Sequence, residues 1–282
     1  MPRRIALLVL VASLVSLPSA AARSLFAHRD RLVGERRAAP TCRGKPATIV
    51  GTRGNDYLAG TESRDVIVGL GGNDRIKGLE GNDLICGNEG KDRLKGVAGE
   101  DVLLGGGQND ALYAAAGGRD LLFGGEGRDV LTMSDPAGGI GHGGPGDDYV
   151  LGTSGPDRLF GDGGSDHLEA YQGDDLIDGG PGADWMHFVF SSVTVDLLAG
   201  TSSGADEGND TIVDIENVEG SNEADVITGS DGPNEIRGQV GNDTIFGAGG
   251  NDRLAGESGA DTVDGGPGTD TCKAESVVNC EA

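Results

Sequence analysis

The chain of 282 residues carries a formal net charge of −24, with 53 glycines and only 4% aromatic residues. This charge argues against a nucleic-acid-binding protein, because contacts with phosphates need a basic face. The scarcity of aromatic residues argues against an ordinary globular core, and composition alone leaves a glycine-rich disordered linker open as the alternative.

Residues 1–22 have the parts of a secretory signal peptide. Arg3 and Arg4 precede an apolar stretch at residues 5–17, and the alanines at 20–22 supply a small-residue cleavage pattern. The apolar stretch is too short to span a bilayer comfortably, although a membrane anchor is the alternative interpretation. We therefore expect export of the chain without insertion into a membrane.

Residues 23–40 hold five arginines against two acidic residues and are expected to form a basic, disordered linker. The four cysteines lie beyond it, and export permits them to form disulfides. Four cysteines allow three pairings, of which their positions favour Cys42–Cys86 near the start and Cys272–Cys280 at the end. No CxxC spacing occurs, which argues against a zinc site.

From residue 51 onward the chain repeats a nine-residue unit, G-x-x-G-N-D-x-L/I-x, as in GLGGNDRIKGLEGNDLICG at 69–87. Nineteen aspartates follow the spacing, and each has an apolar residue two positions later, so the disordered linker is rejected. The periodic aspartates are Asp56, Asp65, Asp74, Asp83, Asp92, Asp101, Asp110, Asp120, Asp129, Asp148, Asp157, Asp166, Asp175, Asp184, Asp225, Asp243, Asp252, Asp261 and Asp270.

Several units depart from the pattern. A one-residue insertion falls in the alanine stretch at 114–116. The following degenerate unit places Gly138 where the aspartate belongs and Ile140 at the apolar position. Asn234 occupies one aspartate position without its charge. Metal sites are therefore in doubt at these units.

Residues 188–219 interrupt the array with an insert. Val193, Val195 and Leu197 alternate with polar residues, which predicts a longer strand. Asp210, in the triplet Gly-Asn-Asp at 208–210, repeats the motif off register and indicates one more coil. Aromatic residues that could form a binding patch gather around this insert: Tyr149, Tyr171, Trp185, Phe188 and Phe190.

The nonapeptide resembles G-G-x-G-x-D-x-U-x, the RTX or haemolysin-type calcium-binding repeat of bacterial proteins. The resemblance covers most of residues 51–273 and implies an all-β fold, a right-handed parallel β-roll with two repeats per coil. The expected organisation is a repeat array with an N-terminal cap (41–187), the insert (188–219), a second array (220–273) and a disulfide-closed cap (274–282).

Stacked coils would place equivalent aspartates about 5 Å apart, where two carboxylates repel by about 3 kcal/mol at an effective dielectric near 20. A hard divalent cation reverses this repulsion. Calcium takes six to eight oxygen ligands from carboxylates and carbonyls, whereas magnesium requires a small octahedron and keeps its waters. We therefore expect about a dozen Ca²⁺ ions and a chain that folds when they bind.

The resemblance also implies the ligands. In the family, the aspartate binds calcium together with backbone carbonyls of its own turn and of the turn two repeats away. This assigns all nineteen aspartates as ligands, with carbonyls of turn glycines such as Gly69, Gly72, Gly78, Gly81, Gly238, Gly241, Gly247 and Gly250.

The most direct function is a secreted, non-catalytic calcium-binding protein. The alternatives are a calcium-dependent adhesion or ligand-binding module at the cell surface and an accessory module of an extracellular enzyme. Gly200 to Gly204 matches the hydrolase pattern GxSxG, but no histidine follows Ser202, and no HExxH motif occurs. The sequence indicates neither a protein or glycan partner nor an oligomeric state.

Overall fold

The computed structural model describes residues 39–280, which form strands, turns and bends without any helix. The predicted signal peptide and nearly all of the predicted basic linker lie outside the described residues. Within residues 39–280 no helix is long and apolar enough to cross a membrane.

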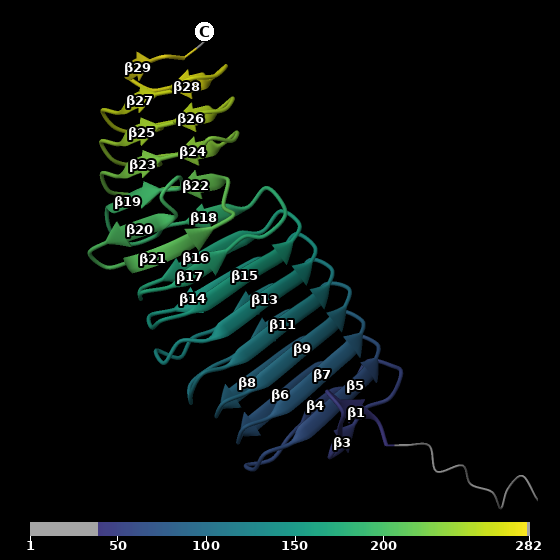
Figure 1. Ribbon diagram of the computed structural model, residues 1–282. Coiled ribbons are helices and arrows are strands. Elements are labelled where there is room, and N and C mark those ends of the chain that lie inside the picture. The colour runs from purple at the N-terminus through teal and green to yellow at the C-terminus, as the bar shows by residue number, and fades with distance from the viewer. Residues whose placement is uncertain (1–38, 281–282) are drawn as a thin grey trace, which may run out of the picture. The chain divides into compact units, whose positions relative to one another are not determined.

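Strands alternate along the chain between two sheets, and a short hairpin of β1 (Thr41–Cys42) and β2 (Lys45–Pro46) precedes them (Figure 1). The twelve-stranded sheet contains β4 (Tyr57–Ala59), β6 (Arg75–Glu80), β8 (Arg93–Ala98), β10 (Ala111–Tyr113), β12 (Val130–Thr132), β14 (Tyr149–Thr153), β16 (His167–Tyr171), β18 (Trp185–His187), β22 (Asn217–Glu219), β24 (Glu235–Arg237), β26 (Arg253–Ala255) and β28 (Thr271–Lys273). The fifteen-stranded sheet contains β3 (Ile49–Val50), β5 (Val66–Gly71), β7 (Leu84–Glu89), β9 (Val102–Gly107), β11 (Leu121–Glu126), β13 (Ile140–Pro145), β15 (Arg158–Gly163), β17 (Leu176–Asp178), β19 (Val193–Asp196), β20 (Thr201–Gly204), β21 (Gly208–Val213), β23 (Val226–Thr228), β25 (Thr244–Phe246), β27 (Thr262–Asp264) and β29 (Ser276–Val278).

The core lies between the two sheets and consists of the apolar residues two positions after each aspartate. Leu94, Leu112 and Leu131 pair directly across β8, β10 and β12, and each is 0% exposed. The alternating burial of neighbouring positions follows from the two-residue period of a strand. This arrangement confirms an all-β parallel solenoid with two repeats in each coil.

The degenerate unit differs from the prediction by one residue. Gly139, not Gly138, takes the aspartate position, since its N–H donates to Oδ1 of Asp157. Gly141, not Ile140, pairs with the buried Leu122 and Leu159. The side chains of Val150 and Met133 fill the space that a side chain at Gly141 would occupy. The prediction failed because it took Ile140, the apolar residue, for the inward one. The inward position is Gly141, and side chains from other parts of the solenoid fill the core there.

The insert adds strands to the fifteen-stranded sheet. β19 pairs antiparallel with β20, which pairs antiparallel with β21, and β21 returns to a parallel pairing with β17. Val193 and Val195 of β19 point into the core, as the alternation predicts. Ser202 lies within β20 and donates to Asp210, so the GxSxG match lacks the strand–turn–helix setting of a hydrolase.

Both predicted disulfides are present. Cys42–Cys86 joins the hairpin β1–β2 to β7, with 5.8 Å between the Cα atoms. Cys272–Cys280 closes the last coil, with a Cα–Cα distance of 5.9 Å. In the loop-entropy model the longer N-terminal loop contributes about 4 kcal/mol to the free energy of unfolding.

Candidate metal sites

Every one of the nineteen predicted aspartates lies directly before a strand, and a hydrogen bond links each to an adjacent coil. The backbone N–H of Asp74 donates to Oδ1 of Asp92 at 2.8 Å, and the N–H of Asp92 donates to Oδ1 of Asp110 at 2.7 Å. The bond recurs wherever a later aspartate occupies the same position. The carboxylates therefore form columns that run from coil to coil.

Two columns result, one before each sheet. The first column comprises Asp56, Asp74, Asp92, Asp110, Asp129, Asp148, Asp166 and Asp184, and then Asn234, Asp252 and Asp270. The second column comprises Asp65, Asp83, Asp101 and Asp120, then Asp157, Asp175 and Asp210, then Asp225, Asp243 and Asp261. Asp210 thus joins the column, as its off-register triplet indicated.

The second carboxylate oxygen, Oδ2, is the unusual atom in these columns. In most described loops it is buried and has no hydrogen-bond partner. Buried polar atoms without partners are rare in folded proteins, because each loses its hydration without compensation. The aspartates with this orphaned oxygen include Asp74, Asp83, Asp92, Asp101, Asp110, Asp129, Asp148, Asp166, Asp175, Asp184, Asp243, Asp252 and Asp261.

A glycine stands five residues before the orphaned oxygen in all of these loops except that of Asp175, where Ala170 takes the position. A Cβ built on Gly143 would lie 2.5 Å from Oδ2 of Asp148 and 2.8 Å from the carbonyl oxygen of Gly161 in the next coil. Two oxygens from successive coils thus converge on one position beside Gly143. This pairing of an orphaned carboxylate oxygen with a carbonyl fits a hard cation that takes oxygen ligands.

The residue four positions before each orphaned oxygen has a left-handed backbone, even where it is not glycine. Leu70 has φ of 84° and Val97 has φ of 121°, both uncommon for residues with a Cβ. Such conformations persist where the surrounding structure imposes them. Stacking of the loops therefore overrides the local preference of these residues.

The glycine carbonyls that the resemblance assigned as ligands all face a glycine of an adjacent coil. Those of Gly69, Gly78, Gly238 and Gly247 face the preceding coil, and those of Gly72, Gly81, Gly241 and Gly250 face the following one. Among residues 39–280, no three His, Cys, Asp or Glu side chains meet as in a site made only of side chains. A cation between these loops would therefore need backbone carbonyls.

Burial raises the pKa of most column carboxyls, because the charged form loses its hydration. The pKa of Asp110 rises to about 8, with the N–H of Asp92 opposing and the charges of Asp129 and Asp92 adding to the rise. The pKa of Asp175 also rises to about 8, mainly through burial. Asp65 differs: burial acts upward, but hydroxyls of Thr48 and Thr61 bring its pKa below the ordinary value.

Acidification should stabilise the folded form of the metal-free chain. The pKa of Asp110 is about 8 in the folded chain, against about 3.9 in an unfolded one. Between these values the folded chain binds more protons, so its free energy of unfolding increases as the pH falls. Circular dichroism of metal-stripped protein should show strand content rising from pH 8 towards pH 5. Constant or falling strand content would contradict this expectation.

Not all predicted aspartates carry an orphaned oxygen. Asp56, Asp65, Asp157 and Asp225 accept a backbone N–H at Oδ2 from a threonine or serine four residues earlier. Asp120 follows the alanine insertion and is buried, but its Oδ2 is not among the orphaned atoms. These threonines and serines stand at a regular position in the sequence, but the sequence alone does not show that their N–H groups bond to the carboxylate.

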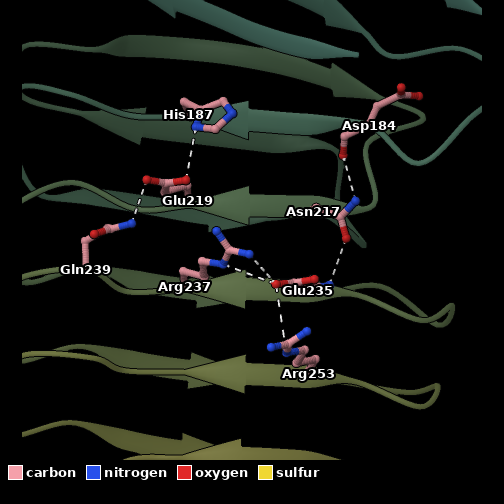
Figure 2. Close-up of polar contacts among 8 residues, drawn as sticks. All are labelled: Asp184, His187, Asn217, Glu219, Glu235, Arg237, Gln239 and Arg253. Carbon is pink, nitrogen blue, oxygen red and sulfur yellow. Dashed lines mark hydrogen bonds and ion pairs between the residues drawn. The ribbon is translucent and has the colours of Figure 1, made fainter. Parts of the chain in front are cut away.

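In two places a glutamate, instead of an aspartate, accepts the N–H of the last aspartate in a series. The nine-residue spacing did not predict these glutamates. Glu216 accepts the N–H of Asp184 at 2.9 Å, and Glu275 accepts the N–H of Asp261 at 3.0 Å. Figure 2 shows the junction beside Glu216, where Asn217 donates to the carbonyl of Asp184 and accepts the N–H of Glu235. At this junction the side chains of Glu216 and Asn217, rather than that of an aspartate, therefore link the coils.

The aromatic residues around the insert do not form one exposed patch. Tyr149 and Trp185 stack on His167 along the outer face of the twelve-stranded sheet. Phe188 is buried in the core, whereas Phe190 is 49% exposed and touches Tyr171. His187, beside Trp185, pairs with Glu219 at 3.4 Å (Figure 2).

A comparison with known protein families identifies the same repeats that form the aspartate columns. The family model of the RTX calcium-binding nonapeptide repeat (4 copies) matches residues 50–85, 86–118, 115–131, 142–175, 160–188, 219–254 and 240–272. The unmatched intervals contain the degenerate coil and the insert. A search of curated proteins gives no match.

Proposed function

Since the chain belongs to the family of RTX calcium-binding nonapeptide repeat proteins, we propose that it is a secreted protein that folds on binding about a dozen calcium ions. The aspartates with an orphaned Oδ2 would hold the ions together with glycine carbonyls of adjacent coils. Calcium would supply the positive charge that offsets repulsion within each column. A non-catalytic role fits a chain whose described part consists of repeats and an insert.

The orphaned Oδ2 atoms carry this proposal. They are buried at most positions of both columns and lie beside glycines that leave room for a ligand. Within the described residues, ordinary side-chain donors do not satisfy them. Without a cation, each would cost the folded chain the hydration of a charged group. Export agrees with two disulfides, which persist in oxidising surroundings.

Chelation of calcium should unfold most of the repeat array. We expect far-UV circular dichroism to lose its strand signal in excess EGTA and to regain it at about 0.1–1 mM free Ca²⁺, the range of extracellular modules. Magnesium at the same concentration serves as the control and should restore little. Strand content that survives chelation unchanged would refute folding on calcium binding.

A second candidate function, calcium-dependent adhesion, is favoured by a basic face on this acidic protein. The face consists of Arg75 and Lys77 on β6 and Arg93 and Lys95 on β8, all exposed and without an ion pair to any described residue. Tyr57 on β4 flanks it at one end and Tyr113 on β10 at the other. Two rows of cations on a flat sheet suit a polymer with regularly spaced anions, and the rings suit packing against sugars. We therefore include an acidic polysaccharide as a candidate ligand.

Dextran sulfate is a suitable probe of this basic face. In calcium, the double variant Lys77→Gln/Lys95→Gln should bind immobilised dextran sulfate at least about tenfold more weakly, since the loss of even one hydrogen bond to a charged group costs about 1.5–3 kcal/mol. Arg158→Gln on β15 of the other sheet is the matched control and should bind as the wild type does. Equal binding by all three proteins, or binding to neutral dextran, would exclude this function of the face.

A further inference from the structure

Each column is divided into runs, within which successive aspartates are linked by the N–H to Oδ1 bonds described above. The runs begin at Asp56 and Asn234 in the first column and at Asp65, Asp157 and Asp225 in the second. What precedes these residues is not an aspartate loop. Gly139 precedes Asp157, Val193 precedes Asp225, and the carbonyl of Glu216 accepts Nδ2 of Asn234.

All five first loops share one feature that the described later loops lack, a threonine or serine four residues before the column position. Its backbone N–H donates to the side-chain oxygen at 2.6–2.7 Å. Its hydroxyl accepts the N–H two residues later at 3.0–3.2 Å. These hydroxyl residues are Thr52, Thr61, Thr153, Ser221 and Ser230.

The hydroxyl explains the difference between the two kinds of loop. By accepting the N–H two residues later, it fixes a local turn in which the threonine or serine is not left-handed. Its own N–H then points at the carboxylate. In the later loops with an orphaned Oδ2 the corresponding residue is left-handed, and Oδ2 has no such donor. The loops of Asp120 and Asp210 are the exceptions, and Oδ2 of Asp210 accepts the hydroxyl of Ser202. The same oxygen is therefore satisfied by N–H in one kind of loop and left for a cation in the other.

We propose that these five loops, called start loops (52–56, 61–65, 153–157, 221–225 and 230–234), bind no calcium through their own Oδ2 or amide oxygen, and that each run takes its ions from the second loop onward. The inference rests on the proposed function. A cation approaching this oxygen would meet hydrogens that already point at it. The carboxylate also reaches back to the preceding coil through Oδ1, and a start loop has no aspartate loop behind it to share an ion.

Asn234 supports the inference independently. It is the one described column position where an amide replaces the carboxylate while the loop keeps its form, and it lies in a start loop. Its Oδ1 accepts the N–H of Ser230 at 2.7 Å, as the carboxylates do in the other start loops. Loss of the charge is compatible with a loop that needs no cation.

Asparagine variants test the proposal in two runs, each by comparing the start loop with the next loop. Asp157→Asn and Asp225→Asn alter start loops, whereas Asp175→Asn and Asp243→Asn alter the next loops of the same runs. The full chain is titrated with calcium, and bound ions are counted by equilibrium dialysis with elemental analysis. The slope of unfolding free energy against the logarithm of free Ca²⁺ gives a second count.

The start-loop variants should keep the wild-type ion number and calcium midpoint. Each later-loop variant should lose one ion, because a charged ligand is lost. The calcium concentration at its folding midpoint should rise at least about threefold. Equal losses in both pairs, with calcium binding by the wild type intact, would overturn this inference and leave the proposed function standing. A wild type that takes up no calcium would overturn both.

A gain-of-hydroxyl variant covers the case in which the later-loop variants fail to fold. Ala248, with φ of 67°, occupies the hydroxyl position in the loop of Asp252. Ala248→Ser should create a start loop there and remove one ion, whereas the matched Ala248→Gly should keep the wild-type number. An unchanged ion number in Ala248→Ser would count against the proposal.

Discussion

Gly143→Ala is expected to lose calcium binding at its own coil and to raise the calcium concentration needed for folding. The new Cβ would lie 2.5 Å from Oδ2 of Asp148 and 2.8 Å from the carbonyl oxygen of Gly161. One of these oxygens belongs to the backbone and cannot move without shifting the next coil. Overpacking of this kind costs about 1–3 kcal/mol, and displacement of the two oxygens removes ligands as well. We therefore expect the ion number to fall by at least one.

Gly163→Ala is the matched control for this variant. Gly163 ends β15, the strand next to β13, and a Cβ added there would meet no atom within 4 Å. Neither glycine has a left-handed backbone, so conformational strain does not distinguish them. Gly163→Ala should keep the wild-type ion number, and its calcium midpoint should change little. If both variants lost an ion equally, the space beside Oδ2 would not be what the glycine provides.

The columns could be predicted because their cause is a spacing. Nine residues hold one strand and one turn, and two such repeats make one coil. An aspartate before every strand must therefore lie beside the aspartate two repeats later, in the next coil. The inward side chains follow from the same spacing, as Leu94 and Leu112 show. Even Cys272, an unusual residue at an inward position, pairs with Leu254 as the period requires.

Features that depend on contacts between coils could not be predicted in this way. At Gly141 the core is filled by Val150 on β14 and by Met133, the residue after β12, so the apolar Ile140 misled the assignment. The orphaned state of Oδ2 depends on the left-handed backbone at residues such as Val97, which its own preference opposes. Spacing alone specifies neither the packing nor this backbone conformation.

The basic face and the start loops were visible in the sequence in principle. Arg75 and Arg93 stand one residue after their aspartates, and Lys77 and Lys95 stand three after, so all four point outward from one sheet. Recognising them requires comparison at intervals of eighteen residues rather than nine. The threonines and serines need a further step, since their importance depends on where each run begins.

Leu168→Ala, the second variant with a large expected effect, should reduce stability without changing the number of ions. Leu168 is 0% exposed and lies between Val150 on β14 and Met186 on β18. Truncation of such a buried leucine costs about 2–5 kcal/mol, through lost burial and the cavity left behind. Its column neighbour Asp166 keeps its bonds to Asp148 and Asp184, so the ligands remain. Leu198→Ala, at a residue 62% exposed, is the control and should behave as the wild type does.

The two kinds of variant separate the contributions of core and cation to one folding equilibrium. If calcium binds only the folded coils, a core defect must be offset by more calcium, so the midpoint rises while the slope of stability against the logarithm of free Ca²⁺ stays constant. Gly143→Ala, by contrast, should lower that slope because an ion is lost. Unfolding of Leu168→Ala at several calcium concentrations, followed by circular dichroism, measures both quantities. A lower slope in Leu168→Ala would mean that ligand geometry depends on the core, and that coil packing and ion binding cannot be treated as separate terms.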